Sequence, residues 1–213
     1  MIQTFLRACA RPFPFLRTWA AAYFRWHTLR EWQRDGRPVP PPHAFKVDTL
    51  IAYGREYGLQ NLIETGTCQG DTVNVVRHHF SQVYSIELSP ELHAAAMRRF
   101  AAAGNVSLIL GDSSVELRRL TDRLQEPALF WLDGHYSAGV TAKGSKETPI
   151  LDELATLFDR SAFSDVIIID DARCFGRDPD YPSLAELEAF VRSRRPDLRM
   201  TVADDLIRLV RPS

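Results

Sequence analysis

Three aspartates follow two strongly apolar stretches of the sequence. Asp170 and Asp171 end the stretch DVIIIDD, and Asp133 comes directly after ALFWL at 128–132. If the two stretches are neighbouring parallel strands, their exits lie about 5 Å apart and the three carboxylates can reach one point. These motifs contain no lysine or arginine, so the carboxylates would repel one another unless they are neutralised.

A hard divalent cation with oxygen ligands, such as Mg²⁺, would neutralise such a cluster. We therefore expect a metal site formed by Asp133, Asp170 and Asp171. The alternative is that the residues act separately, with Asp133 capping a helix and Asp171 facing solvent.

A glycine-containing turn follows another short apolar stretch, NLIET at 61–65. Gly66 and Gly70 are separated by three residues, which allows a tight turn and a close approach of backbone to a ligand. The next helix offers free N–H groups at its start, near Thr72. The spacing differs from the Gly-x-Gly-x-x-Gly of dinucleotide sites, which disfavours a nicotinamide-dependent oxidoreductase. Glu64, ahead of the glycines, suits a cationic ligand group, although an ordinary strand–helix turn would look similar.

Two further acids stand at predicted strand exits. Glu87 stands near the end of the stretch VYSIEL at 83–88, about 20 residues after Gly66, a spacing at which an acid can hold ribose hydroxyls. It could instead be a solvent-exposed residue ahead of a helix cap. Asp112 and Ser113 follow VSLIL at 106–110. Asp112 could accept a hydrogen bond from an exocyclic amine, or cap the next helix, or do both.

These residues are spaced by an alternation of strands and helices. Nearly continuous apolar strands with helices between them predict an α/β fold with a doubly wound, mostly parallel, seven-stranded Rossmann-like sheet. The last segment predicts an antiparallel hairpin at the sheet edge, with a turn at Ala-Asp-Asp. Ligands of such sheets bind outside the carboxyl ends of the strands. The strands are predicted at 61–65, 83–88, 106–110, 128–132, 165–170 and, as the hairpin, within 198–212; the helices at 47–58, 71–80, 90–103, 113–124, 148–158 and 183–194.

The first 42 residues predict a helical extension with a proline-rich linker, RPVPPP, ahead of the main domain at 43–213. Seven arginines stand against two acids in residues 1–37. A basic amphipathic helix over 15–34 could lie on an anionic membrane, while packing on the main domain or on a second subunit is the simpler interpretation. Aromatic residues recur in it at helical spacing: Phe15, Trp19, Tyr23 and Trp26.

The composition narrows the classes of function. With 26 Lys and Arg against 27 Asp and Glu, the 213-residue chain has a net charge of −1, so no nucleic-acid partner is expected. Three widely spaced cysteines suggest neither a disulfide framework nor a zinc site. No apolar run approaches the ~20 residues of a membrane span, and the broken N-terminal stretch does not fit a signal peptide. We expect a cytoplasmic protein, with peripheral contact to a membrane as the alternative.

The order of these motifs resembles the class I S-adenosylmethionine-dependent methyltransferase family from about residue 47 onward. The motifs that carry the resemblance are Glu64-x-Gly66-x-x-x-Gly70, Glu87 and Gly111-Asp112. The resemblance implies that the glycine loop, with Glu64 and Thr72, wraps the methionine part of the cofactor. It implies further that Glu87 holds the ribose and that Asp112 and Ser113 lie near the adenine.

The three aspartates make the chain similar to metal-dependent O-methyltransferases of that family, particularly the macrocin-type sugar branch. His135, in Leu-Asp-Gly-His-Tyr-Ser, departs from that branch. The resemblance implies methyl transfer to a hydroxyl of a small molecule, of sugar or natural-product type, with a divalent cation on the acceptor oxygen. Asp133 or His135 would take the proton. The alternative is a catalytically silent cofactor-binding scaffold that docks through its N-terminal helix.

Overall fold

The computed structural model describes residues 14–133, 149–178 and 181–212, with side chains described from residue 22 onward. Two compact units make up the chain, Met1–Lys46 and Val47–Ser213. None of the described helices is long and apolar enough to cross a lipid bilayer.

In the first unit, a buried tryptophan fixes the turn after helix α2 (Pro14–Arg34). The indole N–H of Trp32 donates a hydrogen bond to the Pro38 carbonyl at 2.8 Å, and its ring centroid lies 4.6 Å from that of Phe45. Tyr23 and Trp26 expose 57% and 51% of their surface. The predicted helix is therefore present with these two rings exposed, and what they contact, whether a membrane, a second subunit or the main domain, stays a prediction.

The second unit is built on one seven-stranded sheet with the strand order β3-β2-β1-β4-β5-β7-β6. The first five strands are parallel, and β7 runs antiparallel to both β5 and β6. The predicted fold class is thus confirmed. The strands are β1 (Asn61–Thr65), β2 (Gln82–Glu87), β3 (Val106–Leu110), β4 (Ala128–Leu132), β5 (Val166–Ile169), β6 (Arg199–Ala203) and β7 (Leu206–Val210).

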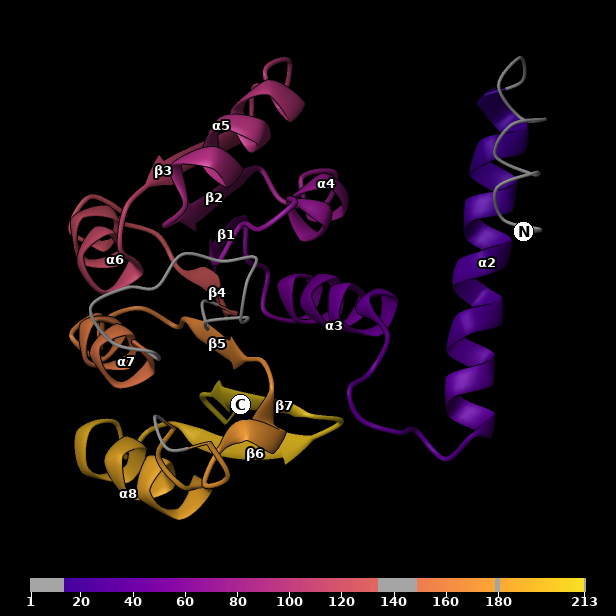
Figure 1. The fold of residues 1–213 in the computed structure, drawn as a ribbon. Coiled ribbons are helices and arrows are strands. Elements are labelled where there is room, and N and C mark those ends of the chain that lie inside the picture. The colour runs from indigo at the N-terminus through magenta and orange to yellow at the C-terminus, as the bar shows by residue number, and fades with distance from the viewer. Residues whose placement is uncertain (1–13, 134–148, 179–180, 213) are drawn as a thin grey trace. The chain divides into compact units, whose positions relative to one another are not determined.

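Helices cover both faces of this sheet (Figure 1). The helices are α3 (His43–Glu56), α4 (Asp71–Val76), α5 (Pro90–Arg99), α6 (Ser113–Thr121), α7 (Ile150–Phe158) and α8 (Leu184–Arg194), with a short 3₁₀ turn, η1 (Ala172–Cys174). On the face covered by α6, α7 and α8, alternate strand residues such as Ile63, Phe130 and Ile167 join leucines of the helices in one apolar core. The opposite face of β1 carries Leu62 and Glu64, and α3 and α4 lie on that side (Figure 1).

Short polar signals set where the helices begin. Ser89 accepts a hydrogen bond from the Leu92 amide and Pro90 takes the first helical position of α5, as predicted. Asp112 caps α6. Several helices end earlier than the sequence pattern predicted; α4, for example, stops at Val76 and not at residue 80, because the chain turns there toward β2.

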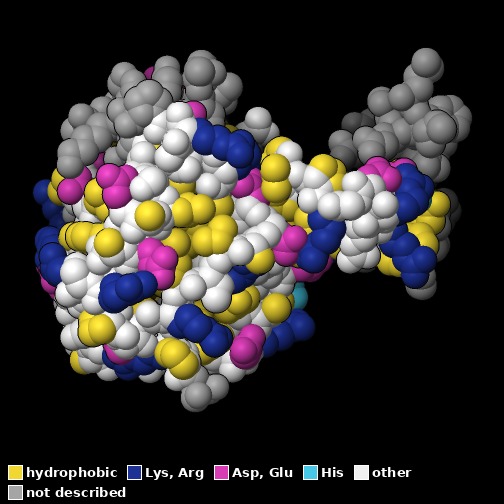
Figure 2. Space-filling model, turned by 90° about the horizontal axis from the view of Figure 1, so that it is seen from below, with side chains coloured by type: hydrophobic (Ala, Val, Ile, Leu, Met, Phe, Trp, Pro, Cys, Tyr) yellow, Lys and Arg dark blue, Asp and Glu magenta, His cyan; other side chains and the backbone are white. Residues whose placement is uncertain are grey.

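The surface near the sheet's hairpin edge mixes all side-chain types. Seen from the end at which α8 and β6 lie in Figure 1, acidic, basic and apolar groups are interspersed (Figure 2). Charge of one sign does not gather on this face of the described residues, in line with the nearly balanced composition.

A buried ion pair ties together the amino ends of β4 and β5. The Arg160 guanidinium donates to Asp165 Oδ2 at 2.9 Å and to the carbonyls of Leu124 and Glu126 at 2.6 and 2.8 Å. Asp165 Oδ1 accepts the Ala128 amide at 2.9 Å. Arg160 and Asp165 are only 6% and 7% exposed. The network keeps the starts of two central strands in register.

Removal of this arginine should be costly, because it leaves the buried Asp165 carboxylate without a counter-charge. We expect Arg160→Met to lower the free energy of unfolding by about 3–5 kcal/mol in urea denaturation. Arg194→Met, which breaks only an exposed pair with Asp159 at 3.6 Å, is the control and should cost less than about 1 kcal/mol. Equal losses for the two variants would contradict a central role of the buried pair.

Candidate functional site

The site lies at the carboxyl edge of the sheet, where the strand order reverses between β1 and β4. The parallel register continues one residue beyond these strands. The Asp133 amide donates to the Thr65 carbonyl at 3.2 Å, and the Asp170 amide donates to the Leu132 carbonyl at 3.1 Å. Residues that follow three neighbouring strands are thereby held at one level of the edge.

This register brings the three predicted metal ligands together. One carboxylate oxygen each of Asp133, Asp170 and Asp171 lies within 4.8 Å of the others. Asp170 and Asp171 are buried, which excludes the alternative that Asp171 faces solvent, while Asp133 is partly exposed. A cluster of hard oxygen donors at this separation fits a small divalent cation. Metal binding itself stays a prediction.

An arginine next to this cluster corrects one expectation. The sequence motifs appeared to lack a basic residue, but Arg173 Nη1 donates to Asp171 Oδ1 at 2.6 Å and also bonds to Asp205. Partial burial opposes the charged form of Arg173, yet the neighbouring Asp171 and Asp205 raise its pKa. Arg173 therefore offsets part of the negative charge. It remains outnumbered by the three clustered aspartates together with Asp205.

Asp205 joins the hairpin turn to the site and was missed in the sequence. Its carbonyl accepts the Ala172 amide at 2.9 Å, and its carboxylate accepts the Arg173 amide at 2.8 Å. Asp171, Asp204 and Asp205 have φ values of 56°, 50° and 63°, in the left-handed region that aspartate tolerates better than most residues. The Ala-Asp-Asp turn was the available signal, since two left-handed residues make a tight hairpin turn.

The glycine loop after β1 is shaped by backbone requirements and by Glu87. Gly66 and Gly70 have φ values of 88° and 76°, and a Cβ on Gly70 would lie 2.7 Å from the Phe100 ring. The buried Glu87 carboxylate accepts the amides of Cys68 at 2.7 Å and Ser89 at 2.9 Å. Each of its oxygens has a second lone pair, so Glu87 can order the loop and still accept ribose hydroxyls.

Glu64 is buried and carries a perturbed carboxyl group. Burial raises its pKa to about 8, against smaller opposing effects of hydrogen bonds with Ser85 and Thr72. Ser85 Oγ donates to Glu64 Oε2 at 2.5 Å, and Thr67 Oγ1 lies 2.6 Å from Ser85 Oγ. At neutral pH the carboxyl is therefore mostly protonated, and a cationic ligand would favour its ionisation.

Asp112 has the capping role that was one of its two predicted roles. Its Oδ1 accepts the Ser114 amide at 2.9 Å and the Ser114 hydroxyl at 2.7 Å. Ser113 is the first residue of α6, beside this cap. Both residues lie at the exit of β3, so the predicted cofactor residues all stand at one edge of the sheet. The second predicted base, His135, lies outside the described residues.

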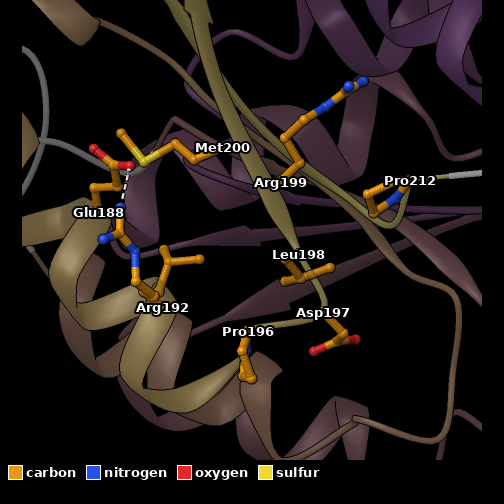
Figure 3. Close-up of a pocket in the computed structure, with 9 residues that line it drawn as sticks. Glu188, Arg192, Pro196, Asp197, Leu198, Arg199, Met200 and Pro212 are labelled. Atoms are coloured by element: carbon orange, nitrogen blue, oxygen red, sulfur yellow. Dashed lines mark hydrogen bonds and ion pairs between the residues drawn. The ribbon is translucent and has the colours of Figure 1, made fainter.

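A separate pocket lies at the other edge of the sheet, between α8 and β6 (Figure 3). Its volume is about 310 Å³, and its wall includes the start of β6 and Pro212 after β7, which places it at the amino ends of the parallel strands. Among its charged groups, Arg192 pairs with Glu188 at 2.7 Å and Asp197 pairs with Arg195 at 2.8 Å. The pocket is therefore remote from the predicted site.

Known proteins resemble this chain in fold and not in sequence. No protein-family profile matches it, and no curated protein sequence matches it. Solved structures do match. The O-methyltransferase TomG from Streptomyces achromogenes, in complex with SAM, is 18% identical with a TM-score of 0.56, over 88% of this chain and 89% of TomG.

Two further solved structures have the same fold. The SAH-bound methyltransferase PaMTH1 from Podospora anserina is 16% identical with a TM-score of 0.55, over 94% of this chain and 97% of its own. The N-methyltransferase NodS from Bradyrhizobium japonicum is 14% identical with a TM-score of 0.53, over 79% and 95%. At these identities the likeness establishes the Rossmann-like methyltransferase fold.

The raised pKa of Glu64 predicts a pH dependence of stability. The folded protein keeps this proton up to about pH 8, whereas the ordinary carboxyl pKa is 4.5, so the folded state binds more protons between these values. Stability should fall as pH rises from 5 to 8, by at most about 1.4 kcal/mol per pH unit from this residue. Urea denaturation at several pH values measures the slope.

Glu64→Gln should make this slope shallower, because the amide does not titrate. Some slope should remain, since burial also raises the pKa of Glu153, to about 7. Glu188→Gln, an exposed change on α8, serves as the control and should leave the slope unaltered. An identical pH profile for Glu64→Gln and the unaltered chain would contradict the buried, protonated state of Glu64.

Proposed function

We propose that this chain is an S-adenosylmethionine-dependent methyltransferase. The observation that carries the proposal is the gathering of the glycine loop, Glu87 and the Asp112–Ser113 pair at one sheet edge, beside the reversal of strand order. The fold it shares with TomG, whose structure holds SAM, and with SAH-bound PaMTH1 supports the same donor.

The chain's own residues suit the parts of this donor. The glycine loop brings backbone close to the methionine moiety, and Glu64 beneath it can become an anion when an ammonium and a sulfonium approach. Glu87 is fixed by two amides and can accept ribose hydroxyls. Asp112 and Ser113 would face the adenine. These contacts would orient the methyl group toward the exits of β4 and β5.

We further propose that the acceptor is a hydroxyl of a small molecule and that Asp133, Asp170 and Asp171 hold a divalent cation. The fold alone leaves the acceptor open, since an N-methyltransferase and a 23S rRNA methyltransferase share it. The carboxylate cluster supports an oxygen acceptor, because a bound Mg²⁺ would bind that oxygen and lower the pKa of its hydroxyl.

In the proposed reaction, the methyl group passes from the sulfonium sulfur to the acceptor oxygen. The electron pair of the broken S–C bond stays on sulfur, so the leaving group is a neutral thioether and needs no acid. The acceptor proton goes to a base of the chain, for which Asp133 and His135 are the candidates. No covalent enzyme intermediate is required, which leaves Cys68 and Cys174 without a catalytic role.

Titration calorimetry with S-adenosylhomocysteine and with NAD tests the cofactor. We expect binding of S-adenosylhomocysteine and no binding of NAD, because the glycine spacing differs from the dinucleotide fingerprint. Glu87→Ala should weaken the binding by at least about tenfold, since it removes both the loop anchor and the ribose acceptor. Binding of NAD in preference to S-adenosylhomocysteine would overturn the proposal.

The single substitutions Asp170→Asn and Asp171→Asn test metal binding independently of cofactor binding. Each should weaken Mn²⁺ binding, followed by electron paramagnetic resonance, by about 10-fold or more, while S-adenosylhomocysteine still binds. Asp159→Asn, which removes the same charge from an exposed side chain, should alter neither Mn²⁺ binding nor S-adenosylhomocysteine binding. Unchanged Mn²⁺ binding in both site variants, or full methyl transfer after removal of divalent ions with EDTA, would rule out the metal role.

A further inference from the structure

The end of β2 holds the glycine loop that follows β1. The Ile86 carbonyl accepts the amide of Gly66 at 2.9 Å and the amide of Thr67 at 3.3 Å. The next residue of β2, Glu87, accepts the amide of Cys68 at 2.7 Å. Successive residues of β2 thus hold successive residues of the loop, so the conformation of the loop depends on this neighbouring strand.

A chain of side-chain hydrogen bonds joins the same loop to Glu64. Thr67 Oγ1 lies 2.6 Å from Ser85 Oγ, and Ser85 Oγ donates to Glu64 Oε2 at 2.5 Å. Ser85 is the register partner of Glu64, so the two side chains lie on one face of the sheet. The exposed fractions of Glu64, Ser85 and Thr67 are 1%, 0% and 3%. Both hydroxyls are therefore shielded from solvent.

The packing of the sheet does not require these two hydroxyls. Backbone hydrogen bonds of the parallel ladder already join β1 to β2. A buried hydroxyl costs free energy of folding unless it is hydrogen-bonded, and alanine at Ser85 with valine at Thr67 would avoid that cost. What the hydroxyls add is a connection: Ser85 gives Glu64 a donor, and Thr67 extends the contact to the residue after Gly66.

Ionisation of Glu64 would fix the direction of this chain. A carboxylate can only accept hydrogen bonds, so the single O–H of Ser85 must then point to Glu64. Ser85 has no other proton to give, and Thr67 must therefore donate to it. When the Glu64 carboxyl is protonated on Oε2, the order of donors can reverse. The chain of hydroxyls thus couples the charge state of Glu64 to the first residues of the loop.

We propose that Ser85 and Thr67 are positioning residues of the donor site, which hold the glycine loop over an ionised Glu64 through this chain of hydroxyls. The inference rests on the proposed function. Neither hydroxyl touches the donor. Together they keep the loop where its backbone can approach the methionine moiety, and they stabilise the carboxylate that the ammonium group of the donor would favour.

Replacement of Thr67 by valine and by serine tests the chain of hydroxyls. Thr67→Val removes the hydroxyl with little change of volume and should weaken S-adenosylhomocysteine binding, measured by titration calorimetry, by about tenfold. Thr67→Ser keeps the hydroxyl and should restore most of the affinity. Thr201→Val, the same replacement at an exposed position of β6, is the control and should leave binding unchanged.

The pH dependence of binding gives a readout that a general loosening of the fold would not change. The hydrogen bond from Ser85 lowers the pKa of Glu64, so Ser85→Ala should raise that pKa further. Affinity should increase with pH as Glu64 ionises, and in Ser85→Ala this increase should occur at higher pH. The Thr72 hydroxyl and the Glu87 charge also act on Glu64 and are the same in both proteins. Ser193→Ala, which removes an exposed hydroxyl on α8, should leave the profile unaltered.

The outcomes separate the two proposals. If the unaltered chain does not bind S-adenosylhomocysteine, the proposed function fails and takes the inference with it. If the unaltered chain binds and Thr67→Val binds equally well, only the inference fails. Equal losses in Thr67→Ser and Thr67→Val, or one pH profile shared by Ser85→Ala and the unaltered chain, would also overturn it. Thr67→Val leaves the donor to Glu64 in place, so the inference stays testable if Ser85→Ala fails to fold.

Discussion

Two backbone hydrogen bonds just beyond the ends of β1, β4 and β5 determine the rest of the site. The Asp133 amide bonds to the Thr65 carbonyl and the Asp170 amide to the Leu132 carbonyl. A slip of one residue between these strands would turn every side chain to the other face and separate the carboxylates. The strands resist such a slip because both of their faces are buried in apolar contacts. The chemistry at the edge is therefore fixed by the packing of the sheet interior.

The same edge accommodates its acidic groups in two physical ways. On the two faces of the sheet below the glycine loop, Glu64 and Glu153 have raised pKa values, so protonation relieves the cost of their burial. Next to the hairpin, Asp171 and Asp205 remain near an arginine. An approaching cation would favour loss of the proton from the protonated carboxyls. Beside the hairpin, it would share the carboxylates of Asp171 and Asp205 with Arg173. Both suit a site for positively charged ligands.

The sequence predicted the fold and most of the polar residues at the carboxyl edge of the sheet, because apolar strands and turn residues are local signals. It also placed Asp133, Asp170 and Asp171 together, since adjacent parallel strands end side by side. It missed Arg173 and Asp205, whose pairing depends on β7 lying next to β5, a contact between segments far apart in the chain. It missed Glu153 as well, because an acid in the first turn of a helix looks like an ordinary solvent-facing residue.

The pairing of Arg173 with Asp205 has a consequence for how the site is assembled during synthesis. β7 lies between β5 and β6 in the sheet but follows every other described strand in the chain. Asp171 therefore acquires its final surroundings only when this late segment has left the ribosome and entered the sheet. A nascent chain can therefore form the glycine loop early, whereas the pairing of Arg173 with both Asp171 and Asp205 is completed last.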